Sequence, residues 1–371
     1  MKWYYVANSR IPTEKAHGVQ IMKTCEALAQ AGVDLELVLP KRDNPLKDDT
    51  YAYYGVATTF PITYLPVWDT VSWGRVGFAF ESLFFAWKAS KYIKKNVESV
   101  VFSRDEWVLF GMRILRRGNF FWESHTGAWS FVARYVTRHA RGVIAITQGL
   151  KDFYITKGIS KNRIVVAPDG IDLDAFKNPE SKEAARTRLG IPLDIHIAGY
   201  IGRLDGWKGT DTLMEAASLL PQHIRLMIIG GESQEVEQYK KQYPDILFLG
   251  YRPYRELAHN QAAVDVLVLP NTAKQKISTH FTSPLKLFTY MASGRPIIAS
   301  NLSSIKEVLN ESNALLIEPD SPHAIAEAIV WLAEHQEEGG ALAAQARKDV
   351  DAYSWQNRAK KIEEFVEATM V

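Results

Sequence analysis

Short runs of β-branched and aromatic residues alternate with stretches of helical periodicity along the whole chain. In the first half the predicted strands are residues 2–7, 34–39, 62–67, 99–103, 119–123, 142–147 and 163–168. Helical patterns are clearest at 19–30, 78–95 and 150–156. Strands that alternate with helices indicate βαβ units and mainly parallel sheets. This half therefore predicts one doubly wound α/β unit.

The segment 172–194 is polar, contains two prolines after the preceding Pro168 and shows no strand pattern, so we place a domain boundary there. A second series of predicted strands follows at 195–201, 225–229, 246–249, 264–269, 296–299 and 314–317. We expect a Rossmann-like N-terminal domain over 1–172 and a Rossmann-like C-terminal domain over 173–352. The charged amphipathic segment 353–371 predicts a last helix that packs back on the first domain.

Composition narrows the class of protein. The 371 residues, 47% of them hydrophobic, suffice for two packed cores, and the net charge of +2 argues against nucleic acid as a partner. The single cysteine, Cys25, excludes an intramolecular disulfide and suits a reducing compartment; we expect it to be a packed helix residue. No apolar run has the length of a signal peptide or a membrane span, so we expect a cytoplasmic protein.

An aromatic stretch followed by lysines allows two interpretations. The residues concerned are Trp68, Trp73, Phe78, Phe80, Phe84, Phe85, Trp87, Lys88, Lys91, Lys94 and Lys95. We favour a domain helix whose aromatic side chains are core and whose lysines face water. The alternative is peripheral contact with the inner face of an anionic membrane, where the aromatic face would present a lipid-linked acceptor to the first domain.

The loops after the strands are the places to look for a ligand, because open parallel sheets bind ligands beyond the carboxyl ends of their strands. After the first strand of the second domain, Arg203 and Lys208 flank a turn bounded by Gly202 and Gly209. A planar guanidinium and a compact ammonium are suited to clamping a diphosphate. The alternative is a solvated loop with incidental charges.

A second candidate is the segment Ser283-Pro284-Leu285-Lys286. It predicts a short helix with Ser283 as N-cap, Pro284 as the first helical residue and Gly294 just past the end. The unpaired N–H groups of its first turn, with Lys286 beside them, can bind an anion. The alternative is a capped structural helix whose Lys286 faces water.

In the first domain, Arg10, His17 and Gly18 follow the first strand, and we expect a helix to begin at residue 19 or 20. Gly18 would let a ligand approach the backbone at that helix N-terminus. The loop lacks the G-x-G-x-x-G pattern, which argues against a dehydrogenase. His125, just beyond a strand after Glu123, is either a residue of the site or a structural hydrogen-bonding group.

Two Asp-x-Asp pairs, at 172–174 and 349–351, are candidate ligands for Mg²⁺ or Mn²⁺ under a diphosphate. We favour a turn for the first pair and a helical tract for the second. We therefore expect no metal site. Walker A and H-E-x-x-H patterns do not occur in the sequence.

Taken in order, these segments resemble the family 4 glycosyltransferases of the GT-B fold over nearly the whole chain. The motifs that carry the resemblance are the Gly18 loop, Arg104-Asp105, Glu123-Ser124-His125, residues 146–150, 168–176, Gly202-Arg203, Lys208-Gly209, residues 283–288 and 294–299. The segment 283–286 places the chain in the Ser-Pro-x-Lys subgroup.

The resemblance implies two Rossmann-like domains facing a cleft and a retaining, metal-independent hexosyl transfer that needs no cofactor beyond the nucleoside-diphosphate sugar as co-substrate. Arg203 and Lys208 would stabilise the leaving diphosphate, and His125 would contact the donor sugar. Donor-binding positions are Gly18, Gly202, Arg203, Lys208, Ser283, Pro284, Leu285, Lys286 and Thr289. The acceptor side, for a glycan, a lipid-linked or a small-molecule acceptor, falls at Arg10, His17, Arg104 and Glu123.

The chain departs from the family's E-x₇-E motif, whose glutamates fall here at Phe281 and Thr289. A threonine is short for a bidentate contact to ribose hydroxyls, so a catalytically weak or inactive GT-B relative stays open as an alternative. A two-lobed binding protein would need an export signal, which the sequence does not show.

Overall fold

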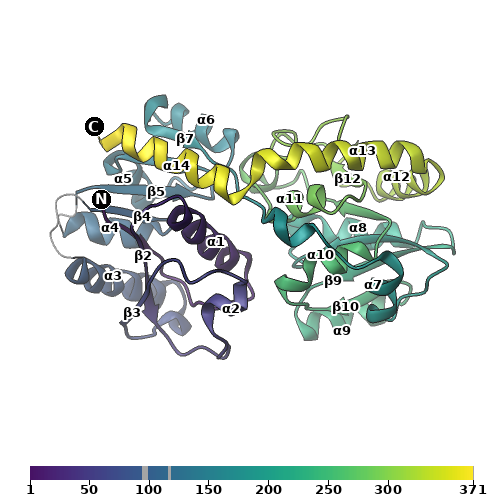
Figure 1. Ribbon diagram of the computed structural model, residues 1–371, viewed down its shortest axis with the longest axis horizontal. Helices are drawn as coiled ribbons and strands as arrows, with labels where there is room; N and C mark the ends of the chain where they lie inside the picture. Colours follow the sequence, from purple (N-terminus) through teal and green to yellow (C-terminus); the bar gives the residue numbers. More distant parts are fainter. Residues whose placement is uncertain (94–98, 116–117, 371) are drawn as a thin grey trace. The chain divides into compact units, whose positions relative to one another are not determined.

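The seven hydrophobic runs of the first half form one parallel sheet. The computed structural model describes residues 1–93, 99–115 and 118–370. The strand order is β3-β2-β1-β4-β5-β6-β7 (Figure 1). The order therefore reverses between β1 and β4, where a doubly wound sheet offers a site for ligands. The strands are β1 (Trp3–Val6), β2 (Leu35–Lys41), β3 (Ile62–Pro66), β4 (Val100–Ser103), β5 (Phe120–Ser124), β6 (Gly142–Ala145) and β7 (Ile164–Val166).

Helices cover this sheet, as parallel strands buried on both faces require. Asp105 illustrates how a helix begins, because its carboxylate accepts hydrogen bonds from the first backbone N–H groups of α4. The helices are α1 (Ala16–Gln30), α2 (Thr50–Tyr54), α3 (Gly74–Tyr92), α4 (Glu106–Ile114), α5 (Phe131–His139), α6 (Gln148–Thr156) and α14 (Trp355–Met370), with the short 3₁₀ helices η1 (Val71–Trp73) and η2 (Lys161–Arg163). Cys25 is buried in α1, as predicted.

The second half forms a six-stranded parallel sheet in the order β10-β9-β8-β11-β12-β13. Successive residues of β8, such as Ile197 and Ala198, enter different hydrophobic clusters, so both faces of the sheet are buried. The strands are β8 (His196–Ile201), β9 (Ile224–Ile229), β10 (Leu247–Gly250), β11 (Val266–Leu269), β12 (Ile297–Ser300) and β13 (Leu315–Ile317). The prediction of two parallel α/β sheets is therefore confirmed.

Seven α-helices accompany the second sheet in the described part of the chain. They are α7 (Lys182–Leu189), α8 (Thr210–Ala217), α9 (Ser233–Gln242), α10 (Leu257–Ala262), α11 (Leu285–Ala292), α12 (Pro322–Glu334) and α13 (Gln336–Asp349). Short helical segments are η3 (Leu173–Phe176), η4 (Gly206–Lys208), η5 (Tyr254–Glu256), η6 (Ile277–Phe281) and η7 (Val350–Tyr353). The segment η6 is a π-helical turn, a rare form that is frequent at functional sites.

The chain divides into two compact units, here called unit 1 and unit 2. Unit 1 contains Met1–Asp169 and Trp355–Val371, and unit 2 contains Gly170–Ser354. The last helix, α14, packs along α1 within unit 1, as predicted (Figure 1). Among the described residues, no helix is both long enough and apolar enough to cross a membrane.

Three predicted helix boundaries were wrong. Helix α1 begins at Ala16 rather than at residue 19 or 20, so Gly18 lies inside its first turn. Helix α3 begins at Gly74, before the predicted start at 78, and ends at Tyr92; Lys94 and Lys95 lie outside the described residues. Helix α11 begins at Leu285, and the oxygen of Ser283 makes no capping hydrogen bond.

Candidate functional site

In unit 2, three loops converge beyond the carboxyl ends of β8 and β11. Gly202 follows β8, and a Cβ atom added there would lie 2.7 Å from Nζ of Lys286, at the start of α11. Gly209 has a φ of 70° and its backbone is packed against the carbonyl of Pro270, so a side chain at this position has no room. The glycines of the predicted phosphate loop therefore allow the close approach of neighbouring segments.

Lys286 is the most unusual charged residue of this region. Its Nζ is buried, makes no hydrogen bond within the described residues and lies 3.8 Å from the centroid of the Tyr200 ring. Burial, and then the charge of Lys208, hold the pKa of Lys286 well below its usual range. The charge of Asp205 acts in the opposite direction but does not outweigh burial. A buried ammonium without a hydrogen bond is costly, and a bound anion would relieve that cost.

Other polar atoms at the same end of the sheet also lack partners. Within the described residues, no hydrogen bond reaches Oγ of Ser283, Oγ1 of Thr210 or Oδ1 of Asn271. Thr210 follows Gly209, Asn271 follows β11, and Ser283 precedes α11. Buried polar groups are normally hydrogen-bonded, so several unpaired groups in loops at the same end of one sheet indicate a place for a polar ligand.

The two cations of the predicted clamp share one carboxylate. Asp205 lies 3.2 Å from Arg203 and 2.9 Å from Lys208. Burial lowers the pKa of Lys208 despite the opposing effect of Asp205. Analysis of the sequence overlooked Asp205, although it lies between the two cations in the sequence. A diphosphate bound here would have to replace Asp205 as the ion-pair partner of Arg203 and Lys208.

Thr289 lies in α11, three residues after Lys286. Its side chain is buried, its Oγ1 accepts a hydrogen bond from Nε2 of Gln261 at 3.0 Å, and the same hydroxyl donates to the carbonyl oxygen of Lys286 at 3.0 Å. The hydroxyl is thus engaged within unit 2, and its predicted contact with ribose stays a prediction.

In unit 1, His125 follows β5 and is bound to the carboxylate of Glu123. The distance from Nε2 of His125 to Oε1 of Glu123 is 2.7 Å. Burial alone would raise the pKa of Glu123, but Arg358, His125 and Arg104 together lower it to about 2. Glu123 is therefore ionised, and it also accepts hydrogen bonds from Gln20 and Tyr5.

The electrostatics of His125 keep its ring neutral. Burial and then Arg104 lower its pKa, whereas Glu123 and Asp169 act in the opposite direction. Because an ionised carboxylate can only accept, the hydrogen of the ring lies on Nε2 and the other ring nitrogen, Nδ1, can accept a hydrogen bond.

A metal ion has one candidate position in the described ranges of the chain. The ligand atoms of Glu123, His125 and Asp169 lie within 4.8 Å of one another. However, Arg358, Gln20 and His125 already donate to Glu123, and two arginines contribute positive charge nearby. This arrangement is a hydrogen-bond network whose donors occupy the carboxylate that a metal would need.

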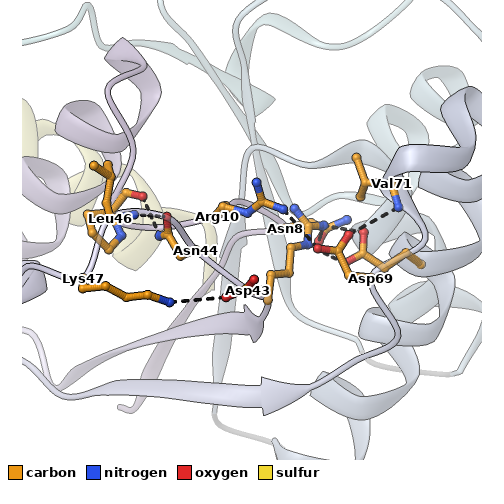
Figure 2. Close-up of polar contacts among 11 residues, drawn as sticks. Asn8, Arg10, Asp43, Asn44, Leu46, Lys47, Asp69 and Val71 are labelled. Carbon is orange, nitrogen blue, oxygen red and sulfur yellow. Dashed lines mark hydrogen bonds and ion pairs between the residues drawn. The ribbon is translucent and has the colours of Figure 1, made fainter.

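The other predicted site residues of unit 1 each pack against, or pair with, different neighbours. The Tyr54 hydroxyl fills the space beside Gly18 that a Cβ would need, so the glycine serves this packing. Arg10 pairs with Asp69 at 3.0 Å (Figure 2), Arg104 donates to Oε1 of Gln20 at 2.9 Å, and His17 lies half-buried in the first turn of α1. Their roles toward an acceptor stay predictions.

A basic hollow of about 510 Å³ lies at the carboxyl ends of β2 and β3. The residues that line it are Lys41, Arg42, Asp43, Asn44, Leu46, Lys47, Pro66 and Val67. Hydrogen bonds link the surrounding loops: Arg42 donates to Glu81 and Asn8, and Asn44 donates to the carbonyl of Pro12 at 2.8 Å. Figure 2 shows the ion pair of Lys47 with Asp43 and that of Arg10 with Asp69 in this part of unit 1. Analysis of the sequence missed the hollow, although Lys41 and Arg42 come just after the predicted strand 34–39, following Pro40.

The aromatic stretch is mostly exposed. Along α3 and the residue before it, Trp73, Val76, Phe80, Leu83 and Trp87 are exposed at spacings of three and four residues, and this set is here called the aromatic stripe. Trp68 is also exposed, whereas Phe85 is fully buried and Phe78 and Phe84 are half-buried. The favoured interpretation, in which the aromatic residues are core, was therefore wrong for Trp68, Trp73, Phe80 and Trp87.

Comparisons with known proteins agree with this architecture. A family model described as Glycosyltransferase Family 4 matches residues 17–175, and one described as Glycosyl transferases group 1 matches 195–335. A D-inositol 3-phosphate glycosyltransferase of Corynebacterium urealyticum is 30% identical over 223 residues, which are 55% of this chain and 51% of the relative. The chain thus spans about half the length of the curated relatives that it matches.

Solved structures match over nearly the full chain but at low identity, so they bear on the fold alone. HepE from Anabaena, in complex with UDP and glucose, has a TM-score of 0.77 at 18% identity and covers 99% of this chain and 100% of its own. Sucrose-phosphate synthase from Thermosynechococcus elongatus has a TM-score of 0.77 at 20% identity and covers 100% and 99%. With one family model on each unit, the chain belongs to the group 1, or family 4, glycosyltransferases and has their GT-B fold.

Proposed function

We propose that this chain transfers a hexose from a nucleoside-diphosphate sugar to an acceptor, with retention at the anomeric carbon. The observation that carries this proposal is the buried Lys286, which makes no hydrogen bond within the described residues and lies, like other unpaired polar groups, in the loops at the carboxyl end of the second sheet. The name of the relative from Corynebacterium urealyticum, a D-inositol 3-phosphate glycosyltransferase, supports the reaction class, and the UDP bound to HepE makes a uridine nucleotide the first donor to test.

Chain residues can supply the positive charge that the leaving diphosphate needs. Arg203, Lys208 and Lys286 would neutralise the phosphates, and Ser283 with the N–H groups of α11 would add hydrogen bonds, as in the Ser-Pro-x-Lys subgroup. Fixed cations of this kind do the work of a metal ion, so we propose metal-independent transfer. His125 would meet the donor sugar with its unprotonated Nδ1.

A titration with UDP, GDP and ADP, followed by turnover with the corresponding sugars, tests the donor. We expect one diphosphate to bind and Lys286→Met to weaken that binding at least tenfold. The matched control is Lys240→Met, which removes an exposed lysine of α9 in the same unit. Equal affinity of both variants and the parent would contradict the proposed donor site.

For the acceptor, we propose that unit 1 works at an anionic membrane surface. The aromatic stripe is flanked by Arg75, Lys88 and Lys91, and the single acidic residue of α3, Glu81, is buried in an ion pair with Arg42. Aromatic side chains beside cations, without an exposed carboxylate on the same helix, match the chemistry of an anionic bilayer surface. The basic hollow would then receive the polar part of a lipid-linked acceptor.

Vesicle flotation decides the membrane proposal. With vesicles of phosphatidylglycerol and phosphatidylcholine, we expect the parent to float at low salt and the variant Trp73→Ser/Phe80→Ser to remain below. The control Trp331→Ser removes an exposed tryptophan of unit 2 and should float like the parent. If the parent does not float, the membrane proposal is wrong.

One observation favours a second candidate, a relative that binds nucleotide-sugar without turnover. The position of the family's second glutamate is Thr289, and its hydroxyl is already engaged with Gln261. Binding of a nucleotide-sugar without release of free nucleoside diphosphate, in the presence of a panel of acceptors, would favour this alternative.

A further inference from the structure

The guanidinium of Arg358 lies in the interior of unit 1, although α14 comes at the end of the chain. Its Nη2 donates to Oε1 of Glu123 at 2.8 Å, and its Nη1 donates to Oγ1 of Thr24, in α1, at 3.0 Å. The side chain of Arg358 is 2% exposed and that of Glu123 is fully buried. Apolar residues could attach a helix equally well, since a buried ion pair adds little net stability. The pair therefore points to a role beyond attachment.

The same carboxylate oxygen connects Arg358 to His125. Oε1 of Glu123 accepts from Nη2 of Arg358 and from Nε2 of His125. The permanent charge of an arginine lets the buried carboxylate stay ionised without a charged imidazole as its counter-ion. The ring of His125 can then remain neutral and still donate its one hydrogen to Glu123.

The other charged and titratable groups around the ring do not replace Arg358. Arg104, after β4, repels a proton from His125, and Asp169, after β7, attracts one. Tyr5 of β1 and Cys25 of α1 face Glu123, but burial holds the pKa of both well above the usual range, so both stay neutral. Arg358 is thus the cation that donates directly to Glu123.

We propose that Arg358 is a positioning residue, which acts through Glu123 to hold His125 as the tautomer with hydrogen on Nε2 and an accepting Nδ1. The inference rests on the proposed function in one respect, namely that Nδ1 of His125 is the atom that faces the donor sugar. The last helix therefore supplies Arg358, which is 235 positions from Glu123 along the chain and fixes the orientation and tautomer of His125 through that carboxylate.

The ring nitrogens of His125 provide the direct test. In the full chain labelled with ¹⁵N-histidine, with His125→Asn identifying the signal, we expect a neutral ring with hydrogen on Nε2 at pH 7. In Arg358→Met the imidazole must become the counter-ion of Glu123, so the midpoint of its titration should rise by about one pH unit or more. The acid limb of turnover, where activity falls as His125 gains a proton, should move up with it.

Controls separate this role from a loss of stability. Arg186→Lys changes an equally buried arginine of unit 2, which pairs with Asp265, and should lower stability without moving the His125 titration. If Arg358→Met does not fold, the double variant Glu123→Gln/Arg358→Met removes both charges; its midpoint should fall below that of the parent, and both neutral tautomers should appear.

An unchanged His125 midpoint in Arg358→Met, or a single unchanged tautomer in the double variant, would overturn the inference. If the parent turns over no donor, the proposed function fails, but the ring titration still decides the role of Arg358. Turnover with a normal acid limb in Arg358→Met would leave the proposed function intact and remove this inference.

Discussion

Two buried ionisable side chains, Glu123 in unit 1 and Lys286 in unit 2, differ in their hydrogen-bond partners. Glu123 accepts hydrogen bonds from four side chains, those of Tyr5, Gln20, His125 and Arg358, and its pKa falls to about 2. Nζ of Lys286 makes no hydrogen bond within the described residues, and its pKa also falls. For a carboxylate the lower pKa means that the fold favours the charge, and for an ammonium it means the reverse.

The difference teaches where a ligand is needed. A buried charge that the protein satisfies by itself sets the geometry of its neighbours, as Glu123 does for His125. A buried charge without a partner makes the empty state costly and the bound state favourable, as we propose for Lys286. The four predictions below test this contrast.

The largest effect is expected for the cations that face the developing charge of the leaving group. Lys208→Ala and Arg203→Ala should each lower turnover by about 10²–10³-fold, because each removes a donor whose contact is strongest in the transition state. Thermal unfolding should change little, since the two side chains share one carboxylate, that of Asp205, and Lys208 adds only a contact with the Trp207 ring within the described residues. Turnover within a few-fold of the parent would place the leaving group elsewhere.

A variant that removes the charge of Lys286 should separate stability from binding. Lys286→Met relieves a buried, unpaired ammonium, so we expect the Tm of the ligand-free protein to rise by about 2–4 °C for each 1 kcal/mol gained. Nucleotide binding should weaken in the same variant, as stated for the donor test. Calorimetry on both forms measures the two changes, and a lower Tm without ligand would mean that the ammonium is satisfied after all.

Acid should remove the contribution of the ionised Glu123 to the stability of the folded chain. The pKa of Glu123 lies at about 2 in the folded chain against a usual 4.5, so the unfolded chain binds more protons between these values and stability falls as pH drops through them. Glu123→Gln should lose this contribution, and its stability should approach that of the parent as pH falls from about 4.5 toward 2. Urea unfolding of both proteins across this range gives the measurement. Glu237→Gln, on the exposed face of α9, should follow the parent throughout.

The smallest effect concerns Thr289, where resemblance and structure lead to opposite expectations. A ribose contact predicts that Thr289→Glu tightens nucleoside diphosphate binding tenfold without loss of stability. The observed burial beside Gln261 predicts a loss of about 1–3 kcal/mol, because a carboxylate would be moved from water into the interior. We expect the second result. Denaturant unfolding with Thr289→Val as the isosteric control, together with a UDP titration, distinguishes the two.

The sequence predicted what local patterns determine. Hydrophobic runs located the strands of both sheets, and Lys286 was a candidate because its motif lies within a few residues of one helix start. The pairing of Glu123 with Arg358 was beyond reach, since nothing in the amphipathic pattern of the last helix tells which residue will meet a carboxylate so far away in the chain. Ser283 was taken for a helix cap because its residue type favours that role; the helix begins later and its hydroxyl is left for another partner.

The return of α14 to unit 1 sets an order of events during synthesis. Arg358 leaves the ribosome 235 residues after Glu123, a delay of about 12–47 s at the usual 5–20 residues per second. Throughout that interval the nascent first unit holds a carboxylate whose permanent counter-ion has not yet been made. Unit 1 can therefore reach its final state only after unit 2 has been translated, and a truncated product that ends at Asp169 would remain an incomplete folding intermediate.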